Sequence, residues 1–183
     1  MINKLKNIFN GRTAKWNQTN NNVVKEMLEN LRNFDGIIEV IFNHLLISTD
    51  LFASELFGIN GAHAVFDFSK TDITKFKKLY TIVICFYGYN IALKNESIYE
   101  ELMGSLPQFC PDIESIKETI RIFNKFSKTE QLELSKVGFK VLDSIGKVFG
   151  ENISVENNIS SLQKLILYYN TALNSIHMSL NIN

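Results

Sequence analysis

Residues 72–95 read DITKFKKLYTIVICFYGYNIALKN, and the middle of this stretch is almost entirely apolar or aromatic. The stretch is longer than an ordinary strand, and Thr71 or Asp72 at its start is a residue type that caps helices. It therefore predicts a helix at about residues 72–94. A strand over residues 81–87 stays open as the alternative, because isoleucine, valine, phenylalanine and tyrosine favour strands.

The predicted helix is apolar around most of its circumference. At 3.6 residues per turn its apolar side chains cover two adjoining stripes, which is typical of a helix at the centre of a bundle or in a membrane. The apolar run is shorter than the ~20 residues that a bilayer requires, and Gly88 and Asn90 interrupt it. We therefore expect a buried central helix and no membrane span, with Gly88 packed closely against another backbone.

The totals limit the class of protein. A chain of 183 residues has the size of a single domain and can bury a sizeable core without disulfides or a metal. It has 19 basic and 19 acidic residues, so its formal net charge is zero. A neutral chain lacks the electrostatic attraction that nucleic-acid binding depends on, and we expect no nucleic-acid partner.

The cysteines and the N-terminal sequence indicate the compartment. Two cysteines, Cys85 and Cys110, are too few for a disulfide framework. The first sixteen residues, MINKLKNIFNGRTAKW, lack the continuous apolar stretch of a secretory signal. We expect a cytoplasmic protein, and the heavy use of isoleucine, asparagine and lysine suggests a bacterium or its phage.

An N-terminal arm is expected at residues 1–18. Met1–Phe9 has the pattern of a short amphipathic helix, and a polar linker follows it around Trp16. The domain proper is expected at residues 19–183.

Three further segments precede the central helix. Thr19 or Asn20 is expected to cap a helix that ends at Asp35–Gly36. Residues 37–57 keep helical spacing as one helix, or as two if the polar triplet Ser48–Asp50 interrupts them. Residues 58–70 are best interpreted as a packed loop, with a helical turn or a short strand as alternatives.

The second half of the chain has clearer helix signals. Ser97 and Glu100 have the spacing of a capping box for a short helix that stops at Gly104. A proline-bearing connection at residues 105–111 follows, and Pro111 is expected in the first turn of the next helix. Ser127 and Glu130 form a second predicted capping box, whose helix continues to Gly150. The most regular apolar spacing in the chain predicts a long C-terminal helix at about residues 154–180.

Together these elements predict an all-α, single-domain bundle of seven to eight helices around the central helix. The C-terminal helices are expected to pack on the central helix and share one core with it.

Few residues suggest catalysis. His63 and Asp67 would share one face of a helix, but two ligands are too few for a metal site. Cys110 beside Pro111 would be a nucleophile candidate, because a helix N-terminus lowers the pKa of a thiol. Without a recognisable base, we expect no catalytic residue, no metal and no cofactor.

The aromatic residues suggest two other kinds of site. Phe76, Tyr80 and Tyr87 are candidates for an apolar ligand pocket beside the central helix, because a buried tyrosine hydroxyl needs a hydrogen-bond partner. Trp16 and Tyr168 are candidates for contact with a protein partner.

The leading hypothesis is a non-catalytic, cytoplasmic protein-interaction module, such as an immunity protein, antitoxin or adaptor that occludes another protein. The alternatives are a small-molecule sensor or carrier, and an enzyme that uses His63, Asp67 or Cys110. A homodimer is compatible with all three.

Overall fold

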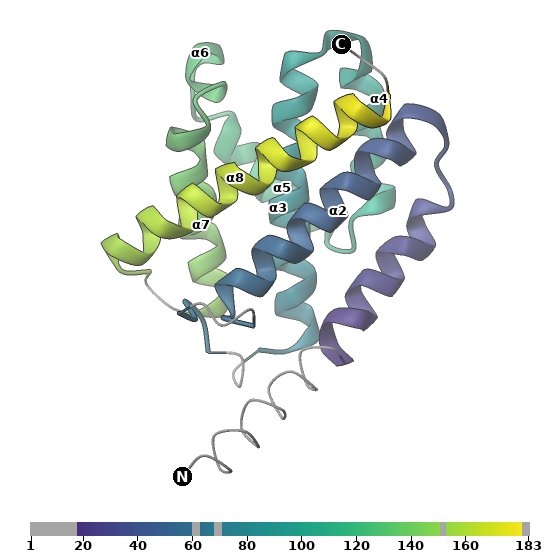
Figure 1. Cartoon of the computed structure of the whole chain (residues 1–183). Coiled ribbons are helices and arrows are strands. Elements are labelled where there is room, and N and C mark those ends of the chain that lie inside the picture. Colours follow the sequence, from purple (N-terminus) through teal and green to yellow (C-terminus); the bar gives the residue numbers. More distant parts are fainter. Residues whose placement is uncertain (1–17, 60–62, 68–70, 151–152, 181–183) are drawn as a thin grey trace.

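The computed structural model describes residues 18–59, 63–67, 71–150 and 153–180, which form eight helices and no strand (Figure 1). The helices are residues 18–31, α2 (Gly36–Leu56), α3 (Ile73–Lys94), α4 (Glu96–Phe109), α5 (Ile113–Phe123), α6 (Lys128–Gln131), α7 (Leu134–Phe149) and α8 (Val155–Ser179). The predicted all-α bundle is confirmed. The amphipathic helix expected at Met1–Phe9 lies outside the described residues.

The α3 helix is the centre of the bundle. Every residue from Leu79 to Ala92 is buried, and α3 packs on α2, α4, α5 and α7. Its N-cap is Asp72, whose carboxylate accepts a hydrogen bond from the Lys75 backbone N–H at 2.9 Å. The predicted central helix is therefore confirmed, and the strand alternative for residues 81–87 is wrong. Buried residues from all the described helices except α6 form one hydrophobic cluster with α3.

The glycine that allows close packing is not the one that was expected to. A Cβ at Gly88 would meet the side chains of Leu45 at 3.5 Å and Leu106 at 3.7 Å, so the expected contact with a backbone is wrong. The tighter site is Gly138 on α7. A Cβ there would lie 2.6 Å from Leu162 Cδ1 of α8, closer than packed carbon atoms approach.

The α2 helix is continuous through its polar triplet, so the alternative of two helices is wrong. Asp50 lies inside α2, where its carboxylate accepts hydrogen bonds from the side chains of Asn20 and Tyr80. This tertiary contact uses the side chain that would otherwise compete for backbone hydrogen bonds. The first helix is already helical at residue 18 and ends at residue 31, so the expected cap at Thr19 or Asn20 is wrong. Gly36, at φ 57°, begins α2 instead of ending the helix before it.

The α2 and α8 helices lie side by side and antiparallel on one face of the bundle (Figure 1). His44 Nε2 lies 2.9 Å from Ser179 Oγ near one end of the pair. At the other end Lys164 Nζ lies 2.8 Å from Glu55 Oε2. The described part of the segment after α2, residues 63–67, is an irregular loop packed on the bundle through the buried Phe66, as expected.

The connection around the two prolines is shorter than expected. The α4 helix continues past Gly104 and through Pro107 to Phe109. Pro107 lies in the last turn, where its missing N–H removes only one hydrogen bond. The helix begins after Asn95, without the capping box expected for Ser97 and Glu100. The next helix is capped by Asp112, whose carboxylate accepts from Ser115 N at 2.8 Å, so the placement of Pro111 in its first turn is wrong.

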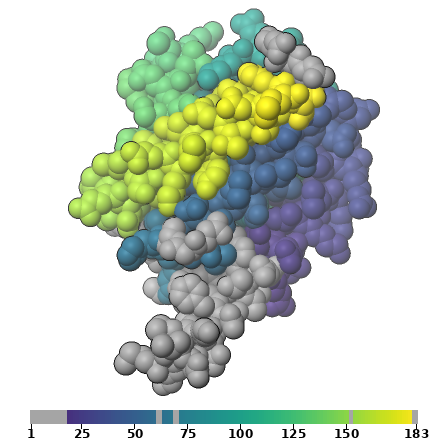
Figure 2. Space-filling view, viewed as in Figure 1, coloured from purple at the N-terminus to yellow at the C-terminus, as the bar shows by residue number. Residues whose placement is uncertain are grey.

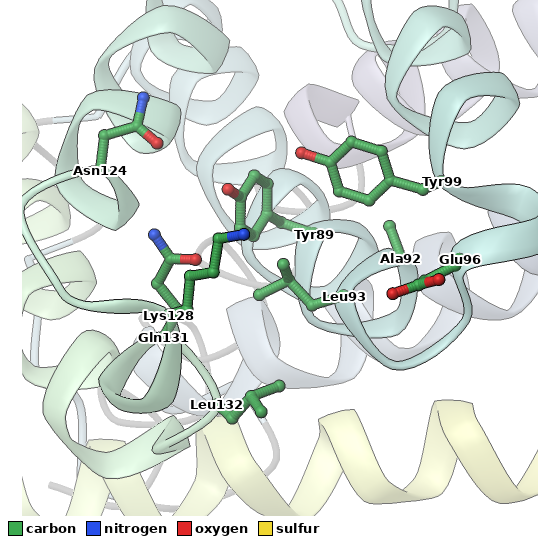
Figure 3. Close-up of a pocket in the computed structure, with 9 residues that line it drawn as sticks. All are labelled: Tyr89, Ala92, Leu93, Glu96, Tyr99, Asn124, Lys128, Gln131 and Leu132. Atoms are coloured by element: carbon green, nitrogen blue, oxygen red, sulfur yellow. The ribbon is translucent and has the colours of Figure 1, made fainter.

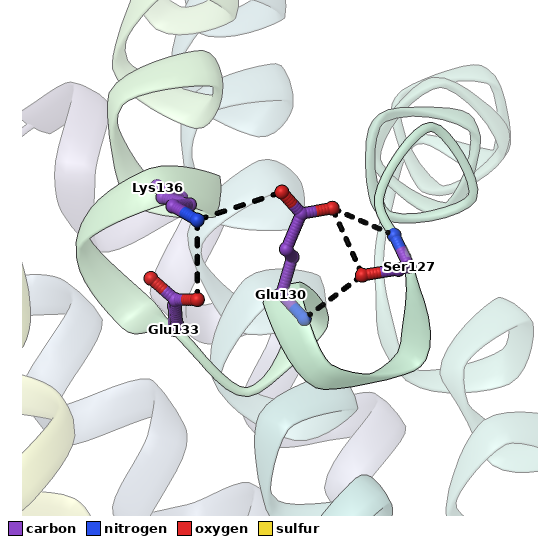
Figure 4. Close-up of polar contacts among 4 residues, drawn as sticks. All are labelled: Ser127, Glu130, Glu133 and Lys136. Atoms are coloured by element: carbon purple, nitrogen blue, oxygen red, sulfur yellow. Dashed lines mark hydrogen bonds and ion pairs between the residues drawn. The ribbon is translucent and has the colours of Figure 1, made fainter.

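The second predicted capping box is present (Figure 4). The Glu130 backbone N–H donates to Ser127 Oγ at 3.3 Å, and Glu130 Oε2 accepts from the Ser127 backbone N–H at 3.1 Å. The box begins only the single turn α6, and α7 begins separately at Leu134. Lys136 of α7 connects the two helices through ion pairs with Glu130 at 3.5 Å and Glu133 at 3.1 Å.

The long C-terminal helix is confirmed as α8. Ser154 is its N-cap, with Oγ accepting from Asn157 N at 3.3 Å. The helix then continues to Ser179.

Candidate functional site

Two of the predicted pocket residues, Phe76 and Tyr80, lie in the α3 core. Both are fully buried. Phe76 stacks on Phe57 with ring centroids 5.2 Å apart, and the Tyr80 hydroxyl donates to Asp50 Oδ1 at 2.6 Å beside the amide oxygen of Asn20. Burial, followed by the charge of Asp50, raises the pKa of Tyr80 well above its ordinary value.

Tyr87, the third predicted pocket residue, lies two turns further along α3. Its hydroxyl donates to the backbone oxygen of Leu165 at 3.0 Å, which joins α3 to α8. Its pKa is also raised well above the ordinary value, chiefly by burial. Both tyrosine hydroxyls thus have protein partners, and a ligand at these residues stays a prediction.

The structure describes only one of the two residues predicted to contact a partner protein. Trp16 lies outside the described residues. Tyr168 is partly buried on α8, and its pKa is raised first by burial and then by the charge of Glu55. Its ring packs partly against the hydrophobic core. Contact of Tyr168 with a partner protein stays a prediction.

The residues considered for catalysis are not arranged as the sequence suggested. His63 and Asp67 are exposed in the irregular loop, so the helical spacing that would place them on one face does not apply. Cys110 follows the end of α4 and is buried, and this burial raises the pKa of its thiol, contrary to the expected lowering. No group of three or more potential metal ligands occurs among the described residues.

Pockets open at several places on the described surface. One, of about 500 Å³, lies between the end of α3, the start of α4 and α6. A second, of about 400 Å³, lies between α5 and α7 and is lined by four basic and two acidic side chains. The third, of about 240 Å³, lies between α2 and α8 near His177. None of these three is lined by Phe76, Tyr80 or Tyr87.

The first turns of α8 carry an exposed apolar surface. The stripe that starts at Val155 and Ile159 is buried only from Leu162 onward. Val155 is 76% exposed and Ile159 is 47% exposed. None of the six residues 155–160 is buried, and we call this segment the α8 overhang. Figure 2 shows α8 crossing the face beside α2, with the overhang at the edge of the molecule.

The α2 helix, which lies beside α8, is itself apolar. Among the described helices, α2 alone has the length and composition of a helix that could cross a membrane. Half of its most apolar stretch is buried inside the bundle. A core helix meets the same criterion. Here α2 also carries Asp50 and Glu55, which bond to neighbouring helices.

Comparisons of the chain with protein-family models, with curated proteins and with solved structures give no match. The all-α fold and the geometry of its surfaces are therefore the basis for a functional proposal.

Proposed function

We propose that the chain is a non-catalytic, cytoplasmic protein-interaction module that binds and covers a surface of another protein. Bacterial immunity proteins, antitoxins and adaptors act in this way. The observation that carries the proposal is the α8 overhang, where a regular apolar stripe continues beyond the core that buries the rest of it.

The overhang supports binding because Val155 is largely exposed and Ile159 is half exposed. Burying Val155 and Ile159 against a partner would contribute about 2–4 kcal/mol, at the usual value per buried aliphatic side chain. Glu156, Asn157 and Ser160 flank the two residues. An apolar centre with a polar rim is the common anatomy of a protein interface.

An aromatic side chain is also partly exposed on the helix that packs on α8. Phe139 of α7, the helix that packs on α8, is 37% exposed. Aromatic side chains are enriched at interface centres, where they supply much of the binding energy.

The cytoplasmic part of the proposal has separate support. Cys85 and Cys110 are both free and buried, so the core contains two reduced thiols and no disulfide in the part of the chain that the structure describes. This is the usual state of cysteines in a reducing compartment.

The test is affinity purification from the native host with three versions of the chain. They are the unchanged chain, the double variant Val155→Lys/Ile159→Lys, and the control Ile113→Lys. Ile113 is the same residue type as Ile159, is 52% exposed, and lies on α5. All three substitutions are at exposed positions, so circular dichroism should show the same helix content.

We expect one stoichiometric partner with the unchanged chain and with Ile113→Lys, and its loss with the double variant. Recovery of no stoichiometric partner, or equal recovery with both variants, would contradict the proposal. If the chain forms a dimer and the double variant abolishes it, the partner that binds the overhang is a second copy of the chain instead.

A further inference from the structure

The pocket of about 500 Å³ between α3, α4 and α6 combines side chains of different chemistry (Figure 3). Its apolar surface comes from Ala92, Leu93 and Leu132. Its polar groups are the hydroxyls of Tyr89 and Tyr99, the amides of Asn124 and Gln131, and the charges of Lys128 and Glu96. A few converging polar groups over an apolar surface are typical of a small-molecule site.

Gln131 supplies a fixed acceptor to this pocket. The residue is 9% exposed, and its Nε2 donates to the backbone oxygens of Phe123 at 3.1 Å and Phe126 at 3.3 Å. Only the amide nitrogen can donate, so these two bonds determine which way the amide is turned. The remaining Oε1 points toward the pocket interior (Figure 3).

The two tyrosines supply hydroxyl donors. The Tyr89 and Tyr99 rings lie edge to face with centroids 6.3 Å apart, and the Tyr99 hydroxyl points into the pocket (Figure 3). Burial, and then a side-chain hydrogen bond with Tyr99, raises the pKa of Tyr89 to about 12. Tyr89 is protonated at neutral pH, as an ordinary tyrosine is.

Lys128 and Glu96 place opposite charges on the same pocket. Among the residues that the structure describes, no ion pair joins Lys128 to Glu96. Leu93 lies between these two side chains (Figure 3). A simple anion would be attracted by Lys128 and repelled by Glu96, and a simple cation would meet the reverse. A ligand with both charges can satisfy both side chains at once.

We propose that this pocket binds a small zwitterion that carries a carboxylate and an ammonium group, of which a free amino acid is the simplest. The carboxylate lies against Lys128 and the Tyr99 hydroxyl, and the ammonium group lies against Glu96. An apolar side chain of the ligand packs on Leu93 and Leu132. This site is separate from the α8 overhang and does not depend on a protein partner.

The test measures binding of the standard L-amino acids to the full chain by NMR, each at about 10 mM, well above a millimolar Kd. We expect at least one amino acid with an apolar side chain to bind. Its N-acetyl derivative and its methyl ester should each bind about fivefold more weakly, because each removes one charge.

Variants then assign the binding to the pocket. Lys128→Gln and Glu96→Gln should each weaken binding about fivefold. Lys125→Gln is the control, because it removes an exposed lysine that lines the α5–α7 pocket, and it should leave binding unchanged. All three side chains are exposed, so an unchanged melting temperature without ligand will show that each variant folds.

Three results would overturn the proposal. The first is no binding of any amino acid at about 10 mM. The second is equal binding of the charged and blocked forms. The third is binding of inorganic phosphate or adenosine monophosphate that Lys128→Gln abolishes and Glu96→Gln strengthens, which would make the pocket a simple anion site.

Discussion

The Tyr80 hydroxyl donates a hydrogen bond to Asp50 Oδ1 at 2.6 Å, joining the buried centre of α3 to the middle of α2. Asn20 of the first helix donates to the same carboxylate oxygen at 2.6 Å. Three helices therefore meet at one polar cluster beside the apolar core. A buried network of this kind stabilises the fold when each member has a partner, and it is costly to leave incomplete.

Replacing Tyr80 with Phe should lower the free energy of unfolding by about 1–3 kcal/mol, because Asp50 and Asn20 lose a buried partner. Urea denaturation measures the change. Tyr169→Phe is the matched control, because its hydroxyl is buried and has no hydrogen-bond partner among the described residues. That substitution should be neutral or stabilising. Equal losses for both variants would show that the Tyr80 hydrogen bond contributes nothing specific.

Gly138→Ala should destabilise the protein by about 1 kcal/mol, because the new Cβ would lie 2.6 Å from Leu162 Cδ1 and force that side chain to shift within the α7–α8 contact. Thermal unfolding followed by circular dichroism measures the effect. Gly104→Ala is the control, since nothing lies within 4 Å of its Cβ and the residue is inside α4. It should stabilise the chain by about 0.5–1 kcal/mol through helix propensity. A Gly138→Ala variant as stable as the Gly104→Ala variant would contradict the tight α7–α8 contact.

The protein should lose stability as the pH rises above about 9. Burial raises the pKa of several thiols and phenols in the folded chain, so the folded state holds protons that the unfolded state releases at the ordinary values of 9.0 for cysteine and 10.0 for tyrosine. The stability from these groups is complete below those values and is lost as the pH rises toward the folded values. The groups are Cys85, Tyr89 and Tyr169, each with a pKa of about 12, and Tyr80, Tyr87 and Cys110, each raised well above its ordinary value.

Phenolate absorbance and helix content, measured over the same pH series, check this expectation. The absorbance of the buried tyrosines should appear together with the loss of helix. Complete titration of all six tyrosines near pH 10 with the helices intact would contradict it.

Local sequence signals predicted the helices well where the determining contact is also local. Asp72, Ser127 and Ser154 all cap the helices expected after them, because a cap depends on residues within one turn. The central helix was predictable for a similar reason, since its apolar circumference exceeds what one neighbouring helix can cover.

The local signals at Ser97, Glu100 and Pro111 nevertheless failed. Other predictions failed because a distant contact decides the local structure. Asp50 remains inside α2 because Tyr80, thirty positions along the chain, occupies its carboxylate. Val155 and Ile159 follow the apolar period of α8, but that period does not reveal where the neighbouring helices end. The pocket around Gln131 has no sequence signal, because it forms only where α3, α4 and α6 meet.

The most direct test of the proposed function is photo-crosslinking in the native host from a reactive amino acid at position 159. The same amino acid at position 113, where the native isoleucine is similarly exposed, is the control. We predict a crosslink to one partner protein from position 159 and none to that protein from position 113. The absence of any protein crosslinked from position 159, or the same crosslinked proteins from both positions, would contradict an interaction through the α8 overhang.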